Sequence, residues 1–380
     1  MNNSKTTYLS IGSNQGDKLN NLQEAVFAIQ KKAGFVTGLS SVYKTPAWGF
    51  EGEDFLNACL ALQTFLSPEQ LLESILEVET SLGRKRGNEK GYQPRTIDID
   101  IIYYELEVIS TENLVIPHPN LQDRRFVLRP LADIAPQFYH PIINKDTRNL
   151  LQECPDKSVM EKTLLKLYKS KEELFSKLNF ITIEGNIGAG KTTLANMIAD
   201  DFNAKVVLER FADNPFLPKF YEDQSRYAFP LEMSFLADRY QQFTDDTSQF
   251  DLFKNFMVSD YDIYKSLIFA NVTLQKEEFS LYRKVFTFMH KEVVKPDIFI
   301  YLYQNSERLL SNIKKRGRDY EQNISAEYLE KINRGYLDFI KSSPERRSLI
   351  IDVSELDFVQ NQNDYEYILD EIQKFTVSLP

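Results

Sequence analysis

The sequence feature that most constrains the fold is a complete G-x-x-x-x-G-K-T motif at residues 185–192, which directly follows the apolar stretch 180–183. Glycines let the backbone curl so that successive N–H groups point at phosphate oxygens, and the following helix adds the positive end of its dipole. Lys191 can then reach the outer phosphates, and the Thr192 hydroxyl can bind Mg²⁺. The motif therefore predicts a strand, a phosphate loop and a helix. The residues expected to contact the phosphates are Gly185, Asn186, Ile187, Gly188, Ala189, Gly190, Lys191, Thr192 and Thr193.

Nearly half of the 380-residue chain precedes this motif, so more than one domain is expected. The net charge of −10 disfavours nonspecific binding to nucleic acid. The chain has only two cysteines, no apolar run of membrane-spanning length, and a start that does not lead into a signal-peptide core. These features predict a cytoplasmic protein with neither a nucleic acid nor a membrane as partner.

The chain is predicted to divide into a first domain at 1–158, a helical linker at 159–178 and a second domain at 179–380. A cluster of turn residues at 155–158 marks the boundary, and residues 160–178 are rich in Lys and Glu with spaced leucines. The second domain alternates strands and helices, which predicts an α/β fold with a parallel sheet covered on both faces. Its expected strands lie at 180–183, 205–208, 256–259, 297–303 and 348–353, and its clearest helices at 230–243, 275–294, 306–315 and 326–341.

The first domain has a different pattern of elements. Strands are expected at 6–10, 35–43, 55–65 and 96–104, and amphipathic helices at 18–32 and 68–82. The resulting order β-α-β-β-α-β predicts a ferredoxin-like α+β sandwich.

Two aspartates, Asp98 and Asp100, are two residues apart in an apolar stretch of the last predicted strand. Residues i and i+2 of a strand point to the same face, so both carboxylates would lie together. Such a pair is costly unless a cation binds it, and Mg²⁺ bound together with substrate phosphates is the natural candidate. The alternative is a half-exposed strand with a polar face. Basic residues nearby in the sequence, at 84–86, 95 and 124–125, favour the metal-bound polyphosphate.

A series of short motifs occurs in order over residues 7–136: GSNQGD at 12–17, YKTPAWG at 43–49, FLN at 55–57, LGR at 82–84, PRTIDID at 94–100, PHP at 117–119 and RRFVL at 124–128. In these motifs the first domain resembles 6-hydroxymethyl-7,8-dihydropterin pyrophosphokinase, an enzyme family of folate synthesis. The resemblance implies transfer of a diphosphate from ATP to the hydroxymethyl group of the pterin, with AMP as the second product.

The resemblance also implies roles for individual residues of the first domain. Two Mg²⁺ ions would bridge the ATP phosphates and the attacking hydroxyl, and two aromatic rings would stack on the flat pterin. The implied residues are Asp98 and Asp100 for the metal, Arg84 and Arg95 for catalysis, His118 and Arg124 for ATP, and Thr45, Phe55, Asn57 and Phe126 for the pterin.

Three further features narrow the function of the second domain. Glu209 follows a predicted strand, where a carboxylate could accept a hydroxyl proton or be a solvated strand end. Arg316 and Arg318 follow a predicted helix, where they could close on a transferring phosphoryl group or form a basic surface loop. Aromatic and charged residues are mixed at 226–232, where they could sandwich a base or belong to the core.

Together with the phosphate loop, the segments 209–217, 220–239 and 316–321 resemble the deoxynucleoside kinase family over roughly residues 179–378. The resemblance implies that a carboxylate takes the proton of the deoxyribose 5′-hydroxyl, and that a lid of arginines clamps the ATP phosphates. The implied residues are Glu209, Arg316, Arg318 and Asp260 for catalysis, and Tyr221, Glu232, Arg239 and Glu321 for the nucleoside. Tyr221 and Glu321 would hold the 3′-hydroxyl, and Glu232 falls where many members carry a glutamine that reads the base.

One segment departs from the family pattern. Many members have an acidic residue, an arginine and a serine after the third strand, whereas this chain has V-S-D-Y at 258–261. Asp260 could fill the acidic role, but the adjacent arginine is missing. The departure leaves open which group steadies the 5′-oxygen.

These features favour an enzyme with two activities, one on the pterin and one on a deoxynucleoside, both of which use ATP and Mg²⁺. Deoxyadenosine is the favoured nucleoside, with deoxyguanosine and deoxycytidine open, and the resemblance implies a homodimer through the kinase domain. In one alternative only one domain is catalytic and the other binds nucleotide or regulates. In another the chain is a nucleic-acid-dependent ATPase, which the acidic net charge argues against.

Overall fold

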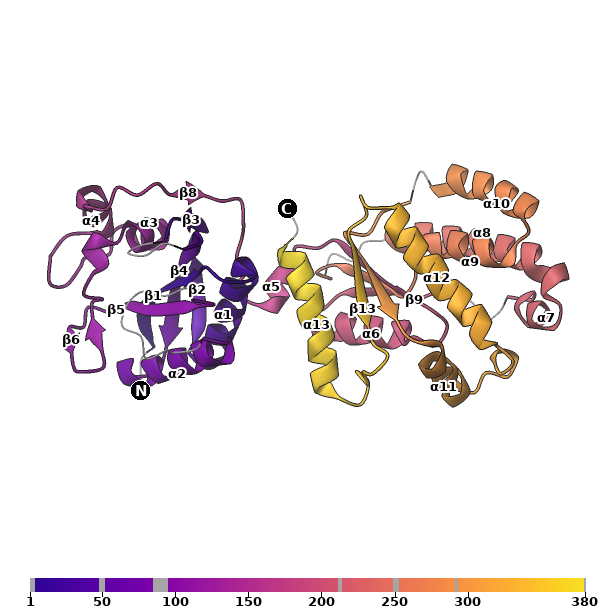
Figure 1. Cartoon of the computed structure of the whole chain (residues 1–380), viewed down its shortest axis with the longest axis horizontal. Helices are drawn as coiled ribbons and strands as arrows, with labels where there is room; N and C mark the ends of the chain where they lie inside the picture. The colour runs from indigo at the N-terminus through magenta and orange to yellow at the C-terminus, as the bar shows by residue number, and fades with distance from the viewer. Residues whose placement is uncertain are drawn as a thin grey trace. The chain divides into compact units, whose positions relative to one another are not determined.

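A computed structural model of the chain describes residues 4–47, 52–84, 95–210, 214–248, 253–290 and 293–378. The chain forms two compact units, Met1–Leu174 with Lys374–Pro380, and Phe175–Gln373. The division at residue 175 lies within the segment 159–178, which the sequence suggests as a linker. Figure 1 shows the helices and strands of both units.

The first unit is built on an antiparallel sheet with the strand order β5-β1-β4-β3-β8, in which β2 also pairs with β4. Its first elements confirm the predicted ferredoxin-like order. Their bounds are β1 Lys5–Ser13, α1 Lys18–Lys32, β2 Phe35–Leu39, β3 Tyr43–Thr45, β4 Phe55–Thr64, α2 Pro68–Ser81 and β5 Asp98–Tyr104. Then follow β6 Ile109–Ser110, β7 Val115–Ile116, the 3₁₀ turn η1 Leu121–Asp123, α3 Arg125–Ile134, α4 Thr147–Glu153 and β8 Glu161–Lys162.

Helices cover both faces of this sheet. On one face, α1 and α2 pack side chains such as Val26 and Ile75 against Leu60. On the other face, α3 and α4 pack Leu128 and Leu150 against alternate residues of the same strands, such as Cys59. The helices α3 and α4 were not among the predicted elements.

Two predictions about this unit are wrong in detail. The strand predicted at 35–43 is two strands, because Ser40 exchanges hydrogen bonds with the backbone of Cys59 and interrupts the ladder. The helix predicted at 160–178 is mostly extended chain, with β8 paired to β3 and a single short helix, α5, at Lys171–Phe175. Leu164, one of the spaced leucines of this segment, is 98% exposed. The backbone hydrogen bonds that begin this segment go to the sheet, for example from Thr163 N to Val42 O, and so do not form a helix.

The second unit confirms the predicted parallel sheet, with the strand order β10-β11-β9-β12-β13. The strands are β9 Phe180–Gly185, β10 Lys205–Val207, β11 Met257–Ser259, β12 Ile298–Tyr303 and β13 Ser348–Asp352. The helical elements are α6 Lys191–Asp201, α7 Leu217–Glu222, α8 Gln224–Ser248, α9 Tyr264–Thr273, α10 Lys276–Met289, α11 Ser306–Arg316, η3 Asp319–Glu321, α12 Ala326–Ser342 and α13 Gln362–Val377. The central strand, β9, runs directly into the phosphate loop.

Helices also cover both faces of the parallel sheet (Figure 1). On one face, Ile268 of α9 and Tyr336 of α12 pack against Phe299 and Tyr301 of β12. The connection from β9 to β10 crosses the sheet in one direction, and the connections from β11 to β12 and from β12 to β13 cross it in the other. Because such crossovers are right-handed, α6 lies on the face opposite to α9 and α12. This reversal of direction beside β9 creates the crevice in which open parallel sheets bind ligands.

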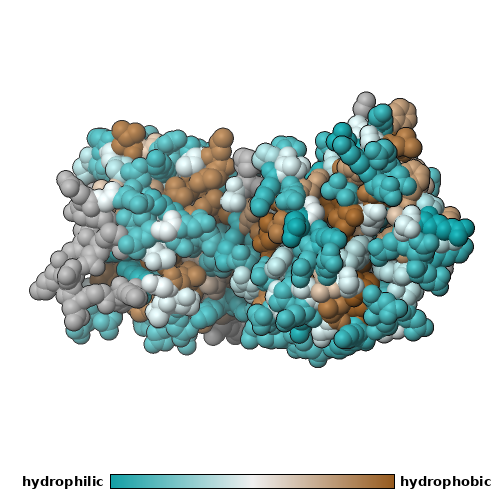
Figure 2. All heavy atoms as spheres, turned by 45° about the vertical axis from the view of Figure 1, so that its right-hand side comes forward, coloured by the Kyte–Doolittle hydropathy of each residue, from teal (hydrophilic) through white to brown (hydrophobic). Residues whose placement is uncertain are grey.

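Hydrophilic side chains cover most of the face shown in Figure 2, and hydrophobic side chains occur there as separate patches. No helix in the described part of the chain combines the length and the apolar character needed to cross a membrane.

Candidate active sites

The first candidate site lies on the sheet face that α3 covers. Asp98 and Asp100 point to this face, because they alternate along β5 with isoleucines that pack toward α1 and α2. In the sheet register, Gly12 of β1 lies opposite both Asp98 on β5 and Asn57 on β4. A Cβ atom on Gly12 would come within 2.6 Å of Asn57 Oδ1. The glycine therefore leaves room for the Asn57 side chain to lie over β1.

The structure brings three of the predicted basic residues to the two carboxylates, whereas residues 85 and 86 lie outside the described residues. Arg84 NH1 lies 2.8 Å from Asp98 Oδ1, and Arg95 NH1 pairs with Asp98 Oδ2. Arg124 NH1 lies 3.6 Å from Asp100 Oδ2. The cluster thus combines residues from the segment after α2, from β5 and from the segment before α3.

The electrostatics of the two carboxylates fit a divalent cation. Burial and repulsion from Asp98 raise the pKa of Asp100 to about 7, although Arg124 and Arg95 act in the opposite direction. Two carboxylates that oppose each other's ionisation gain from a shared cation, and carboxylate oxygens are ligands that Mg²⁺ prefers. Asp98 would exchange at least one of its arginine contacts for such an ion.

His118 lies beside the same pair, with Nε2 4.0 Å from Asp100 Oδ2. The Asn120 N–H donates to Nδ1 at 3.3 Å, and Arg124 NH1 lies 3.4 Å from Nε2. Burial and the nearby Arg124 lower the pKa of His118 to about 4. His118 is therefore a neutral ring near pH 7.

Sequence reasoning missed Glu79, which supports this cluster from α2. Its side chain is 2% exposed and accepts hydrogen bonds from Ile99 N, at 2.9 Å, and from Arg84 NH1. Glu79 therefore orients Arg84 and fixes the backbone between the two aspartates. A signal was present in the sequence, because Glu79 lies four residues after Ile75 on the buried side of the helix.

The residues expected at the pterin lie on the same sheet face or next to it. Asn57 Nδ2 donates to Thr45 Oγ1 at 2.8 Å. The ring of Phe55 lies 3.7 Å from the point where a Cβ atom on Gly12 would sit. Phe126 begins α3, with its ring centroid 5.8 Å from the Arg124 guanidinium. Both rings are partly exposed, as stacking on a ligand requires.

The second candidate site begins at the phosphate loop, which joins β9 to α6 as predicted. Gly190 precedes α6 with φ +87°, and a Cβ atom there would lie 2.7 Å from the ring of Phe358, so this turn requires glycine. Lys191 Nζ donates to Asn186 O at 2.9 Å. The Asn186 side chain donates to Asn333 Oδ1 at 2.8 Å, which ties the loop to α12.

The ends of β10 and β11 bring Glu209 and Asp260 to this loop. Thr192 Oγ1 donates to Asp260 Oδ2, and Glu209 N donates to Asp260 Oδ1 at 2.7 Å. Thr193 follows on the first turn of α6 with an exposed side chain. Asp260 therefore connects the start of α6 to the segment that carries Glu209, as expected where the carboxyl ends of parallel strands meet.

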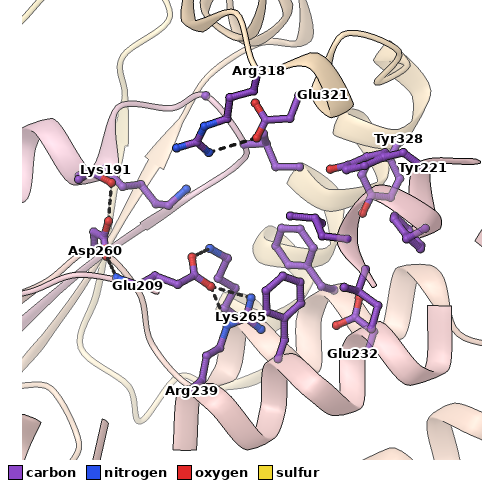
Figure 3. A pocket seen from close by; sticks show the side chains of 18 of the residues that line it. Lys191, Glu209, Tyr221, Glu232, Arg239, Asp260, Lys265, Arg318, Glu321 and Tyr328 are labelled. Atoms are coloured by element: carbon purple, nitrogen blue, oxygen red, sulfur yellow. Dashed lines mark hydrogen bonds and ion pairs between the residues drawn. The ribbon is translucent and has the colours of Figure 1, made fainter. Parts of the chain in front are cut away.

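Two cations hold the Glu209 carboxylate inside the pocket shown in Figure 3. Arg239 binds Oε1 through Nε and NH2, each at 2.7 Å, and Lys265 Nζ donates to Oε2. Burial by itself raises the pKa of Glu209, but Lys265 and then Arg239 outweigh it and hold the pKa well below its usual range. Glu209 is therefore ionised near pH 7.

Lys265 was absent from the predicted site. It lies in the first turn of α9, and it is the single charged residue of an otherwise uncharged helix, Tyr264–Thr273. Its side chain is only 9% exposed. An isolated lysine in an apolar helix was the available signal, because a buried lysine requires a charge partner.

The loop after α11 forms one wall of the pocket. Arg316 and Arg318 both pair with Glu321. Arg316 NH2 contacts Oε2, and Arg318 NH1 lies 3.3 Å from Oε1. Tyr221, on α7, lines the same pocket, and its ring stacks on that of Tyr320 with centroids 6.2 Å apart. The predicted lid residues and the residues expected at the 3′-hydroxyl thus lie together.

The pocket has a cavity volume of about 130 Å³ and opens to solvent. Lys191 and Asp260 lie at one end of it and Glu232 at the other, with Glu209 between them (Figure 3). Glu232 Oε1 lies 3.0 Å from Thr273 Oγ1, whereas no hydrogen-bond donor in the described part of the chain reaches the buried Oε2. Burial raises the pKa of Glu232 to about 7, against the effect of Arg239. A carboxyl with one unsatisfied oxygen is thus available to a ligand.

The fold and both sites define a phosphotransferase with two domains. Residues 181–377 match the family model described as Deoxynucleoside kinase, and residues 8–136 match that described as 7,8-dihydro-6-hydroxymethylpterin-pyrophosphokinase. The chain therefore belongs to the deoxynucleoside kinase family through its second unit and to the pyrophosphokinase family of folate synthesis through its first.

Relatives of each part are known. A deoxyguanosine kinase of Bacillus subtilis is 39% identical over 202 residues, which cover 52% of this chain and 98% of the relative. A 2-amino-4-hydroxy-6-hydroxymethyldihydropteridine pyrophosphokinase of Aquifex aeolicus is 41% identical over 149 residues, which cover 39% of this chain and 91% of the relative. Among solved structures, a deoxyadenosine kinase from M. mycoides is 26% identical, with a TM-score of 0.45, and the match covers 51% of this chain and 99% of that one.

Proposed function

We propose that the chain catalyses two separate transfers from ATP. The first unit would move a diphosphate to 6-hydroxymethyl-7,8-dihydropterin, and the second would phosphorylate the 5′-hydroxyl of a purine deoxynucleoside. The observation that carries the proposal is that each unit contains its own complete set of phosphate-binding and charge-stabilising groups. The set of the first unit centres on Asp98 and Asp100, and that of the second on the phosphate loop and Glu209.

In the first unit, Asp98 and Asp100 would hold Mg²⁺, whose charge would stabilise the ATP phosphates. Arg84, Arg95 and Arg124 lie within reach of the carboxylates, so they would contact the same phosphates. The neutral ring of His118, beside Asp100, would lie close to the same phosphates. Such chemistry depends on positioning and charge stabilisation more than on a strong base.

Asn57, Gly12 and Asp98 lie side by side on three neighbouring strands, and the pterin would lie at the Asn57 end of this row. Asn57 and Asp98 are two strand spacings apart, about 10 Å, and Gly12 between them has no side chain. A flat ring system held by Asn57 and Thr45 could therefore extend its hydroxymethyl group over Gly12 toward the aspartates. Phe55 and Phe126 would stack on the ring.

In the second unit, the phosphate loop would bind ATP and Glu209 would take the proton of the nucleoside hydroxyl. Arg316 and Arg318 would move from Glu321 to the ATP phosphates. That exchange would free the Glu321 carboxylate for the 3′-hydroxyl, beside Tyr221. Thr192 would hold Mg²⁺.

Glu232 supports guanine as the preferred base. The N1–H and exocyclic amino group of guanine are adjacent donors, which an ionised carboxylate accepts together. Adenine presents an acceptor beside a donor, which suits a protonated carboxyl. The named activity of the Bacillus subtilis relative also favours deoxyguanosine. Deoxyadenosine, the expectation from the sequence, is the second candidate.

We also propose that the kinase unit forms a homodimer through α8 and α10. These helices contact each other, and α10 exposes the large apolar side chains Leu281 and Phe288. Light scattering would give twice the chain mass for the wild type. Phe288→Glu would reduce that mass to one chain, and an unchanged dimer would contradict this interface.

One experiment tests both proposed activities. ATP consumption is measured with each of the four deoxynucleosides and, separately, with hydroxymethyldihydropterin. We expect ADP with deoxyguanosine and AMP with the pterin. Turnover with only one class of acceptor would leave the other unit as a binding or regulatory domain.

A further inference from the structure

The Glu209 carboxylate is held by two cations from different helices, Arg239 on α8 and Lys265 on α9. All three side chains are buried, with exposed fractions of 8% for Glu209, 4% for Arg239 and 9% for Lys265. A buried carboxylate needs one cation to balance its charge. Glu209 thus has a second cation beside it, and Lys265 lines the pocket together with the carboxylates of Glu232 and Asp260.

Arg239 has little freedom to leave its position. It binds Glu209 through two nitrogens, donates from NH1 to Ser266 Oγ at 2.7 Å, and places its guanidinium 4.6 Å from the ring centroid of Phe235. The planar guanidinium is thus held on several sides. Arg239 therefore serves as the fixed partner of Glu209.

Lys265 is held differently. Its ammonium carries three donors on a flexible stem, and in the described part of the chain the recorded hydrogen bond of that group goes to Glu209 Oε2. Its Nζ also lies 5.7 Å from the ring centroid of Phe269, and it interacts electrostatically with the carboxyl groups of Glu184 and Glu232. Such an ammonium can keep its bond to Glu209 and donate to a further oxygen.

The position of Lys265 places that charge near the phosphates. Lys265 and Lys191 line the same pocket, and Lys265 lies close enough to affect the phosphate-loop lysine electrostatically. Burial and then repulsion from Lys265 lower the pKa of Lys191 to about 8. Two ammonium groups that repel each other across a pocket favour an anion between them.

We propose that Lys265 positions Glu209 and supplies, together with Lys191, the positive charge that faces the acceptor oxygen during transfer. The inference rests on the proposed nucleoside kinase activity. In that reaction the hydroxyl oxygen forms a bond to the γ-phosphorus, and the bond from that phosphorus to the bridging oxygen breaks. ADP leaves with the electron pair, and the hydroxyl proton passes to Glu209. Lys265 thus provides the cation that the sequence lacks beside Asp260.

The test compares Lys265→Met, Lys265→Gln and Lys265→Arg in the full chain with deoxyguanosine and ATP. The two neutral variants are expected to lower kcat by roughly 100- to 1,000-fold, the scale of losing one charge-stabilising group. The Kd of deoxyguanosine, measured by calorimetry without ATP, is expected to stay within about threefold, because the charge acts in the transition state. The kcat of Lys265→Arg is expected to exceed that of the neutral variants by at least about tenfold.

Lys341→Met, at an exposed site on α12, is the matched control and should retain wild-type kcat. Pterin turnover by the same preparations checks that the chain is intact, and Lys265→Gln gives the result if the Met variant does not fold. A neutral variant with kcat within about threefold of wild type would overturn the role of Lys265 while leaving the kinase activity in place. Equal loss in the Gln and Arg variants would also overturn it. A wild-type chain that phosphorylates none of the four deoxynucleosides would overturn both proposals.

Discussion

The two candidate sites of this chain would hold phosphates with different parts of the protein. In the first unit, side chains gather on one face of an antiparallel sheet, where three arginines surround a pair of aspartates. In the second, a loop after the central strand of a parallel sheet offers backbone N–H groups and Lys191. The first arrangement depends on many separate segments, whereas the second is largely encoded in one short motif.

The carboxylates of the two sites show what sets their ionisation. Burial raises the pKa of Asp100 and that of Glu232 to about 7. Glu209 is equally subject to burial, yet two cations in direct contact hold its pKa below the usual range. Asp100 has a single arginine at 3.6 Å and a neighbouring aspartate that repels it. Contact with cations therefore decides which buried carboxylate is a charged group near pH 7.

The independence of the two sites is tested by disabling one of them and measuring the activity of the other. Asp98→Ala is expected to lower pterin diphosphorylation by roughly 1,000-fold or more, because the metal-binding pair is lost. Formation of AMP from ATP and the pterin measures the effect. Phosphorylation of deoxyguanosine by the same preparation is the control and should be unchanged. Loss of both activities in a folded chain would mean that the two sites are not independent.

A change in the second unit is expected to have the opposite effect on the two activities. Glu209→Ala should lower deoxynucleoside phosphorylation by roughly 100- to 10,000-fold, the range for a general base, while AMP formation with the pterin continues. ADP formation with deoxyguanosine gives the measurement. Glu209→Gln keeps the volume of the side chain and should be similarly impaired. Near-normal activity of the Gln variant would assign the proton to another group.

Glu232, the residue proposed to read the base, offers a smaller effect that separates two candidate substrates. Glu232→Gln is expected to shift the ratio of kcat/KM for deoxyguanosine over deoxyadenosine toward adenine by roughly 10- to 100-fold, because the amide presents a donor beside an acceptor. Steady-state kinetics with both nucleosides measures the ratio. A ratio that does not move would show that Glu232 does not contact the base.

The smallest expected effect is a dependence of base preference on pH. The pKa of Glu232 is raised to about 7, so the carboxyl is ionised above that pH and protonated below it. The neighbours that set this value are Arg239, Thr273 and Lys265, which lower it, and Glu209, which raises it. Because guanine pairs with the ionised form, whose fraction falls from about 0.9 at pH 8 to about 0.1 at pH 6, the preference for deoxyguanosine should fall by about tenfold over this range.

The control for this effect is Glu232→Gln, which cannot titrate and should give a flat ratio across the same range. Measuring the ratio of the two substrates in one enzyme cancels pH effects on Glu209 and on ATP, which both reactions share. A wild-type ratio that is constant from pH 6 to pH 8 would contradict the titration of Glu232 in this range.

Much of both sites was readable from the sequence, because the signals are local. The phosphate loop is defined by glycine spacing, and Gly190 occupies a turn that no larger residue fits. The placement of Asp98 and Asp100 on one face follows from the two-residue period of a strand. The order of elements in both units follows from the periodicity of apolar residues, which reflects burial of one face.

The tertiary structure decided what depends on distant partners. The stretch 160–178 has a helical composition, but pairing of β8 with β3 holds its start extended. Glu79 reaches both Arg84 and the backbone of Ile99, and Lys265 meets Glu209 across 56 positions of sequence. Local periodicity cannot specify such contacts, because burial of a charge is tolerated only where the fold supplies its partner. The sequence by itself identified the segments that form the two candidate sites, whereas the packed fold determined which charged partners surround their buried carboxylates.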